Sequence, residues 1–306
     1  MKVAVIGAGN VGGTLAQRIV EADLCDVVLV DIASGMARAK ALDLADAKSL
    51  TSITAKVEGT GDYKKICASD IVVVTAGFPR QPGMTREDLL KKNVSITRQV
   101  VKEVAKYARD CILIMVTNPL DILTYVALKE SNFNPKRVMG MGGVLDASRF
   151  SNLIAQELNV SAESVKTLVI GAHGEAMMPL LRYCTVNGIG VLELLSREKL
   201  DLIVENTIKR GAEIVSLLGK GSAYYAPSAA VFLMVKAILK NEQKVVPACV
   251  WLSGEYNLKD ICIGVPVKLG RNGIEEIIQV KLNPKEQKQL SNYAQSVKDT
   301  FSRLKK

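Results

Sequence analysis

The chain has 306 residues, of which 48% are hydrophobic and 23% charged, a composition that excludes a disordered protein and leaves room for two domains. Its formal net charge of +9 allows either nucleic-acid binding or the attraction of small anionic ligands. Basic residues form no block of five or more and aromatic residues make up only 5%, so we expect small anionic ligands and no nucleic acid.

The cysteines and the first residues indicate the compartment. Six cysteines form no CxxC pair and there is a single histidine, so we expect reduced thiols, no disulfide framework and no metal site. The apolar run near the amino terminus is too short for a signal peptide or a membrane span. These features predict a cytoplasmic protein that does not bind membranes.

The first predicted elements are a strand, a glycine turn and a helix. KVAVI, from Lys2 to Ile6, is a short apolar run, GAGNVG follows from Gly7 to Gly12, and GTLAQRIVEA has the pattern of an amphipathic helix. In such a setting GxGxxG predicts a dinucleotide site: Gly7 allows a tight turn, Gly9 lets the backbone approach a pyrophosphate, and Gly12 allows close helix packing. The helix amino terminus then offers N–H groups to the phosphates.

The next predicted strand, DVVLVDI, carries Asp31 near its end, at the distance from Gly12 expected for a carboxylate that binds the ribose diol. A carboxylate at this place repels a 2′-phosphate, so the pattern favours NAD over NADP. The alternative is an aspartate that merely caps the strand in another doubly wound fold.

Strands and helices continue to alternate, with a helix near 35–48, a strand over 70–77, a helix over 86–109 and a strand over 111–118. The near-continuous apolar runs are typical of a parallel sheet covered on both faces, which predicts an α/β, doubly wound Rossmann domain. Arg80 and Arg86 lie in or beside a loop rich in proline and glycine, from Phe78 to Asp88. Such a loop is suited to close over an anionic substrate, although a surface turn with solvated arginines is the alternative.

The only histidine, His173, follows the apolar run VKTLVI, from Val165 to Ile170, which predicts a buried strand ending in a turn. Imidazole titrates near neutral pH, so His173 is the candidate general acid/base, against the alternative of a histidine with no catalytic role. Asp146 and Arg149 lie three apart in the predicted helix LDASRFSNLIAQEL and can project into one cleft. Taken singly, they could be a carboxylate at a helix terminus and a surface ion-pair partner.

After about Leu145 the pattern becomes a less regular α+β half. It predicts strands near Val165, Tyr183, Val245 and Ile261, helices over 197–218 and 227–240, and a final helix from Asn283. We therefore expect two domains, a Rossmann domain over 1–143 and a substrate domain over 144–306.

Several motifs occur in an order and spacing that resemble one family: GAGNVG, VDI, TAGFPRQPGMTR, VTNPLD, GVLDASRF and GAHGE. Together they are similar to the lactate/malate dehydrogenase family, and to its lactate-dehydrogenase-like malate dehydrogenase branch. The resemblance implies that His173 is the acid/base, that Asp146 orients it, and that Arg149 binds the substrate carboxylate. It also implies that Arg86 polarises the carbonyl, Asn118 contacts the substrate oxygen and Arg80 binds the far end of the substrate. The cofactor contacts that it implies are Gly7, Ala8, Gly9, Asn10, Val11, Gly12, Asp31, Asn93, Val116, Thr117 and Asn118, with Ser228 a weaker candidate for the substrate.

The resemblance thus implies an NAD-dependent enzyme that interconverts malate and oxaloacetate, a small dicarboxylate pair, and that forms a homotetramer or, alternatively, a homodimer. Two other hypotheses stay open at this point. One is a lactate or other 2-hydroxy-acid dehydrogenase, which the extra cation at Arg80 disfavours. The other is a catalytically idle NAD-binding or basic nucleic-acid-binding protein.

Overall fold

The computed structural model describes residues 1–78, 84–174 and 176–304. The first half is a parallel sheet whose six strands have the order β3-β2-β1-β4-β5-β6. These strands are β1 Lys2–Ile6, β2 Asp26–Val30, β3 Val57–Thr60, β4 Ile71–Val74, β5 Ile112–Met115 and β6 Val138–Gly140. Ile6 pairs with Val30 on one side and with Val74 on the other, so the carboxyl ends of β1, β2 and β4 meet at one edge. The predicted Rossmann fold is therefore confirmed.

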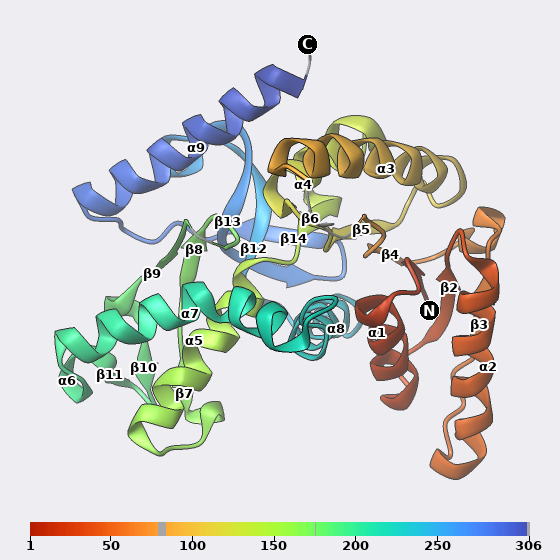
Figure 1. Ribbon diagram of the computed structural model, residues 1–306, viewed down its shortest axis with the longest axis horizontal. Helices are drawn as coiled ribbons and strands as arrows, with labels where there is room; N and C mark the ends of the chain where they lie inside the picture. Colours follow the sequence, from red (N-terminus) through yellow and green to blue (C-terminus); the bar gives the residue numbers. More distant parts are fainter. Residues whose placement is uncertain (79–83, 175, 305–306) are drawn as a thin grey trace.

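Four helices cover this sheet: α1 Asn10–Glu21, α2 Ser34–Thr51, α3 Arg86–Tyr107 and α4 Leu120–Ser131. In Figure 1, α3 and α4 lie on one side of the central strands and α1 lies on the other. A capping box starts α3, because the Thr85 hydroxyl accepts from Asp88 N–H at 3.1 Å while the Asp88 carboxylate accepts from Thr85 N–H at 3.3 Å. The helix that follows the arginine-bearing loop is thus fixed at its first turn.

The second half extends the same sheet with antiparallel strands, beginning where Cys249 pairs with Gly140 of β6. Its strands in this sheet are β12 Lys244–Ser253, β13 Lys259–Gly270, β14 Gly273–Ile277, β8 Val169–Gly171 and β9 Met177–Pro179. A separate small sheet contains β7 Val165–Lys166, β10 Thr185–Val186 and β11 Ile189–Gly190. The helices are α5 Gly143–Leu158, α6 Val191–Leu194, α7 Arg197–Leu218, α8 Tyr225–Leu239 and α9 Pro284–Leu304. This α/β second half agrees with the predicted fold class.

Two predicted strands differ in part from the structure, although β7 begins at Val165 and β10 begins two residues after Tyr183. The apolar run over 165–170 is not one strand, because β7 and β8 belong to different sheets. Between them lies Thr167, whose hydroxyl donates to the Ala147 carbonyl at 2.9 Å and lies 2.8 Å from the Ser151 hydroxyl. Tyr183 lies not in a strand but in a 3-10 turn, Leu181–Tyr183, between β9 and β10.

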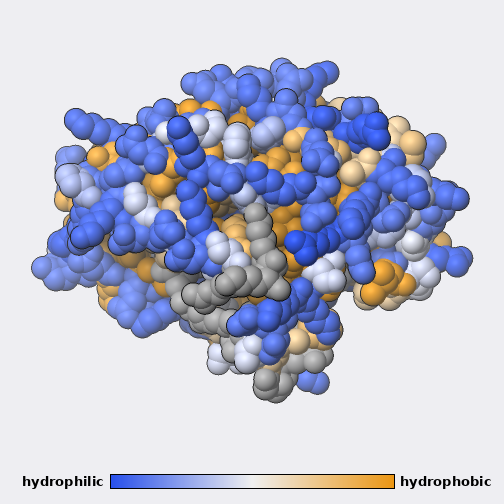
Figure 2. Space-filling model, turned by 90° about the horizontal axis from the view of Figure 1, so that it is seen from above, coloured by the Kyte–Doolittle hydropathy of each residue, from blue (hydrophilic) through white to orange (hydrophobic). Residues whose placement is uncertain are grey.

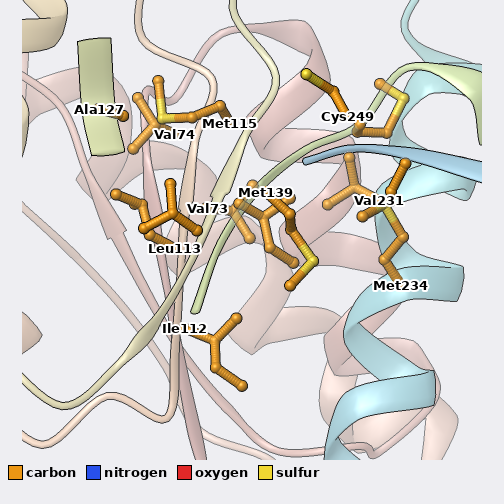
Figure 3. Close-up of a cluster of buried hydrophobic side chains, with 14 of the residues drawn as sticks. Val73, Val74, Ile112, Leu113, Met115, Ala127, Met139, Val231, Met234 and Cys249 are labelled. Carbon is orange, nitrogen blue, oxygen red and sulfur yellow. The ribbon is translucent and has the colours of Figure 1, made fainter. Parts of the chain in front are cut away.

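The main hydrophobic core runs through both halves of the chain. Figure 3 shows side chains of the central strands β4, β5 and β6 in one cluster with residues of α8 and β12, among them Val73, Leu113, Met139, Val231, Met234 and Cys249. The outer face seen in Figure 2 is largely hydrophilic, with hydrophobic residues showing in places. Within the described ranges, none of the helices combines the length and the apolar character needed to cross a bilayer.

Candidate active site

The glycine turn after β1 is packed tightly at two positions and open at a third. Gly7 has φ +105°, and a Cβ on Gly12 would lie 1.9 Å from the Gly7 carbonyl oxygen. A Cβ on Gly9, by contrast, would meet none of the described atoms within 4 Å beyond its chain neighbours. Gly7 and Gly12 are therefore required by the fold itself, whereas Gly9 leaves space beside the backbone for a ligand.

The amino terminus of α1 is available to an anion. Among the described residues no side chain caps it, and its first turn holds no acidic residue. Asp31, at the end of β2, accepts from Ala8 N–H at 2.6 Å and from Ala33 N–H at 2.8 Å. The open Gly9, the uncapped helix and this carboxylate fit a dinucleotide with a pyrophosphate at the turn and a ribose at Asp31.

Lys40 is a cation at this turn that the sequence analysis did not single out. It projects from α2, and its ammonium group donates to the Gly9 carbonyl at 3.0 Å. A Cβ on Gly13 would lie 2.9 Å from the same Lys40 nitrogen. Its signal in the sequence, a lysine nine residues after Asp31, is too common to be recognised without the fold.

Asn93 brings two loops of this edge together. From α3, its amide oxygen accepts from Phe78 N–H at 2.7 Å, and its amide nitrogen donates to the Asn118 carbonyl at 2.9 Å. The hydroxyl of Thr117 donates to the Ala76 carbonyl at 2.7 Å, so the segment after β5 is also hydrogen-bonded to the segment after β4. The predicted contacts Asn93, Thr117 and Asn118 therefore lie together, and the Asn118 side chain is exposed.

His173 is paired with Asp146, as the family resemblance implies. Its Nδ1 lies 2.9 Å from the Asp146 carboxylate, and the two side chains are 14% and 1% exposed. Asp146 lies in the first turn of α5, and a Cβ on the preceding Gly142 would lie 3.4 Å from Cβ of His173. The loop after β8 and the start of α5 thus pack directly against each other, which holds the pair together.

Burial and the neighbouring carboxylates shift the pKa of His173 in opposite directions. Burial lowers its pKa, but the charge and hydrogen bond of Asp146, helped by Asp121, raise it more, so that the pKa of His173 lies above its usual value. Because Asp146 engages Nδ1, the other ring nitrogen, Nε2, is left for proton exchange. A buried imidazole held in this way can act as a general acid or base.

Arg149 provides a fixed positive charge close to this pair. Its guanidinium lies 3.8 Å from the Asp146 carboxylate and is 12% exposed. Burial lowers its pKa and Asp146 raises it, with a net lowering from a very high starting value, so that Arg149 stays cationic. Its Nε is buried and has no hydrogen-bond partner among the described residues.

The structure adds Asp121, which the sequence analysis missed. It lies in the first turn of α4 and is 4% exposed, and it accepts from the backbone N–H of His173 at 3.2 Å and from the Tyr293 hydroxyl at 2.7 Å. VTNPLD ends in this residue, but its importance depends on contacts with residues far away in sequence.

The side chains of two predicted substrate contacts lie outside the described part of the structure, and a third is engaged within the protein. Arg80 lies outside the described residues, and Arg86 is the first residue of α3, with a side chain outside the described part, so both roles stay predictions. Ser228 is buried in α8, where its hydroxyl donates to the Tyr225 carbonyl at 2.9 Å and accepts from Arg18 at 3.1 Å. Its hydroxyl is thus already engaged within the protein.

Comparison with known proteins assigns both halves to one family. Residues 1–140 match the model of the lactate/malate dehydrogenase NAD-binding domain, and residues 143–306 match the lactate/malate dehydrogenase alpha/beta C-terminal domain. The malate dehydrogenase of Methanosarcina barkeri is 47% identical over 303 residues, which are 99% of each chain.

Two solved structures have almost the same fold. The apo malate dehydrogenase of Picrophilus torridus has a TM-score of 0.96 and 40% identity, covering 99% of this chain and 97% of its own. The lactate dehydrogenase of Cryptosporidium parvum, complexed with lactic acid and nicotinamide adenine dinucleotide, has a TM-score of 0.95 and 39% identity, covering 99% and 98%. The backbone fold alone therefore does not separate the two activities.

Proposed function

The chain belongs to the lactate/malate dehydrogenase family, and from this we propose that it is an NAD-dependent malate dehydrogenase, which interconverts malate and oxaloacetate. The observation that carries the reaction type is the 2.9 Å contact between His173 Nδ1 and the Asp146 carboxylate. For the substrate, the support is the full-length similarity, at 46–49% identity, to proteins named malate dehydrogenase.

The protein contributes proton transfer, charge stabilisation and orientation to this reaction. When bound, NAD supplies a nicotinamide ring that exchanges a hydride with the substrate carbon. His173 takes the hydroxyl proton when malate is oxidised and donates a proton to the carbonyl oxygen when oxaloacetate is reduced. Asp146 stabilises the imidazolium form and fixes the ring orientation, so that the proton is exchanged at Nε2.

The cations orient a dicarboxylate between them. Arg149 is proposed to bind the carboxylate next to the reacting carbon, and the position of its guanidinium, 3.8 Å from the Asp146 carboxylate, supports that role. Arg86 is proposed to polarise the carbonyl where negative charge develops, and Asn118 to contact the same oxygen. Arg80 is proposed to bind the second carboxylate, the group that distinguishes oxaloacetate from pyruvate.

The cofactor site is proposed to consist of the glycine turn, Asp31 and the edge held by Asn93. Residues 7–12 would hold the pyrophosphate at the amino terminus of α1, Asp31 would hold the ribose, and Asn93 with residues 116–118 would line the nicotinamide side. Open space at Gly9 supports this placement.

A lactate or other 2-hydroxy-acid dehydrogenase is the alternative on the same scaffold. Among the solved structures, the lactate dehydrogenases are 37–39% identical to this chain and the malate dehydrogenases 34–45%, so these structures do not separate the two activities. The sequence relatives at 46–49% identity are named malate dehydrogenase, which favours that activity. Arg80 favours the dicarboxylate for a physical reason, because a second carboxylate in a closed site needs a partner of opposite charge.

We also propose that the enzyme is a cytoplasmic homotetramer, with a homodimer as the alternative. Five of its six free cysteines are buried, as in a reducing compartment. Large apolar side chains are exposed on α2 and α7, among them Leu42, Leu50, Leu202 and Leu217. Such side chains support association between copies. Light scattering should give about four times the 33.1 kDa of one chain.

The test of the function is NADH oxidation by the purified chain with oxaloacetate as substrate. We expect rapid turnover, and we expect His173→Asn to bind NADH nearly as well but to lose about 10² to 10⁴ in kcat, the usual contribution of general acid catalysis. A His173→Asn enzyme that keeps more than about a third of the wild-type kcat would remove His173 from the mechanism.

A further inference from the structure

A buried carboxyl group, that of Asp121, is hydrogen-bonded to the backbone of His173 and not to its ring. Asp121 of α4 uses one oxygen, Oδ2, to accept from two donors: His173 N–H at 3.2 Å and the Tyr293 hydroxyl at 2.7 Å. Three segments far apart in sequence, namely α4, the loop after β8 and α9, therefore meet at a single atom. In Figure 1, α9 lies over the second half of the sheet, on the side of α4.

The contacts of Asp121 exclude a direct catalytic role. His173 Nδ1 is already paired with Asp146, and the hydrogen bond between Asp121 and His173 is to the backbone, not to the ring. Burial raises the pKa of Asp121 against the lowering effects of the Tyr293 hydroxyl and the neighbouring Cys249 thiol. A buried carboxyl in this setting is expensive to maintain, which calls for a function other than local stability.

The position of Asp121 in the chain connects His173 with the substrate side of the site. It lies three residues after Asn118, whose carbonyl is held by Asn93 at 2.9 Å. These segments pack closely at Gly142, because a Cβ on this residue would lie 2.9 Å from the Leu120 side chain and 3.4 Å from that of His173. The Asp121 hydrogen bond therefore fixes the backbone of His173 relative to the segment that carries Asn118.

We propose that Asp121 is a positioning residue, which holds His173 at the distance from Asn118 that proton transfer requires, and that Tyr293 of the carboxyl-terminal helix completes this anchor. The inference rests on the proposed function only in so far as His173 exchanges the proton. It adds the carboxyl-terminal helix to the groups that determine turnover.

Three variants separate geometry from charge. Asp121→Ala removes the acceptor from both donors. Asp121→Asn keeps an oxygen acceptor and removes only the charge, and Tyr293→Phe removes one donor. Because a misplacement of about 1 Å costs roughly a hundredfold in rate, we expect Asp121→Ala to lower kcat at least about 30-fold while the Kd for NADH stays within about threefold. Asp121→Asn, measured at its own pH optimum, should stay within about fivefold of wild type.

Tyr256→Phe is the matched control for Tyr293→Phe. Tyr256 is buried, whereas Tyr293 is partly buried, and the Tyr256 hydroxyl donates to the Ile278 carbonyl at 2.8 Å. The backbone carbonyl of Tyr256 accepts from Gln287 of α9 at 2.7 Å. We expect both variants to lower the melting temperature, but only Tyr293→Phe to lower kcat, by about three- to tenfold. Equal kcat values in the two variants would show that Tyr293 has a purely structural role and would overturn its part in the anchor.

The single histidine gives a readout that needs no substrate. With ¹⁵N-histidine labelling and no polyhistidine tag, the amide spectrum contains one signal, that of His173. Its hydrogen exchange should be at least about tenfold faster in Asp121→Ala than in wild type, and slow again in Asp121→Asn. If wild type reduced neither oxaloacetate nor pyruvate, the proposed function would fail, whereas this amide would still decide whether the anchor exists.

The results that overturn the proposal are specific. They are an Asp121→Ala enzyme with wild-type kcat, a loss of kcat no larger than the loss of NADH binding, or an Asp121→Asn enzyme as slow as Asp121→Ala. If Asp121→Ala does not fold, the comparison of Tyr293→Phe with Tyr256→Phe, together with Asp121→Asn, carries the decision.

Discussion

Two opposing effects act on the imidazole of His173. Burial favours the neutral ring, and the Asp146 carboxylate 2.9 Å away favours the imidazolium. Burial is the largest single contribution, but the charge and hydrogen bond of Asp146 together with the charge of Asp121 outweigh it, so that the pKa of His173 is raised and the imidazolium is favoured. The pair is a means of keeping a buried base protonated.

Replacing this carboxylate tests the balance. In Asp146→Asn the burial effect remains and the raising effect is lost, so the pKa of His173 should fall below that of wild type. Oxaloacetate reduction requires the imidazolium, so its rate declines as pH rises through this pKa. The falling limb of its pH–rate profile therefore moves to lower pH. Malate oxidation requires the neutral ring, and its rising limb moves to lower pH as well. Titration of the single imidazole signal by NMR should show the same shift, and an unchanged pKa would contradict the role of Asp146.

Arg80 is the residue proposed to select the substrate. With pyruvate bound, its guanidinium would be enclosed and unpaired, and with oxaloacetate it would be paired by two parallel hydrogen bonds. A desolvated charge pair is worth on the order of 2–5 kcal/mol, and each 1.4 kcal/mol is about tenfold. We expect Arg80→Gln to lower kcat/KM for oxaloacetate at least about a hundredfold and to raise that for pyruvate.

Arg86→Gln is the matched control for Arg80→Gln. It removes a cation proposed to act on the carbonyl that both substrates share, so it should slow both of them. Steady-state rates with the two substrates measure the difference. An Arg80→Gln enzyme whose oxaloacetate-to-pyruvate ratio stays within about threefold of wild type would show that another residue selects the substrate.

At the scale of elements, the turn between β1 and α1 separates the needs of the fold from those of the ligand. A Cβ at Gly12 would overlap a backbone oxygen at 1.9 Å, whereas one at Gly9 would meet nothing in the described part of the chain. Gly12→Ala should therefore lower the melting temperature of the cofactor-free protein by several degrees, since overpacking costs roughly 1–3 kcal/mol. Gly9→Ala should leave that temperature within about 2 °C and weaken NADH binding at least about tenfold.

Thermal unfolding and NADH fluorescence titration measure the two effects separately. If Gly9→Ala bound NADH with wild-type affinity, the pyrophosphate would not lie against Gly9. A cofactor-free Gly12→Ala protein as stable as wild type would mean that the turn can shift to relieve the overlap.

Elements with long apolar runs and capping signals could be predicted from the sequence. The pattern of apolar residues correctly predicts strands β1, β2, β4 and β5 and the long helices α3 and α7. In these elements the apolar residues of the pattern are the ones that the fold buries. The run over 165–170 could not be divided correctly, because Thr167, between the two strands, is hydrogen-bonded to Ala147 and Ser151 of α5, which are distant in sequence. Helix α4 was missed, since its apolar residues, buried around most of its circumference, show no clear amphipathic period.

The residues of the candidate site could likewise be predicted only in part from the sequence. The family resemblance implies that His173, Asp146 and Arg149 belong to one site, and Asp146 lies 2.9 Å from His173 and 3.8 Å from Arg149. Asp121 could not be found in this way, because its partners are a backbone N–H 52 residues away and a hydroxyl 172 residues away. Contacts of that range depend on the finished sheet and on α9.

At the scale of the whole molecule, the two halves are joined by a continuous sheet and a shared core. Strand β12 continues the parallel sheet through the pairing of Cys249 with Gly140, and the largest core cluster draws on both halves. The dinucleotide turn comes from the first half and the His173–Asp146 pair from the second, so their relative position depends on this shared packing. A reaction between a cofactor and a substrate requires such a fixed arrangement.

The most direct test of the central claim is the side-by-side measurement of kcat/KM for oxaloacetate and for pyruvate, with NADH and the same wild-type preparation. A malate dehydrogenase that selects its substrate by the second carboxylate should favour oxaloacetate by roughly 10² to 10³ or more, the range expected from one desolvated charge pair. A ratio within about threefold of unity, or a preference for pyruvate, would contradict the assignment.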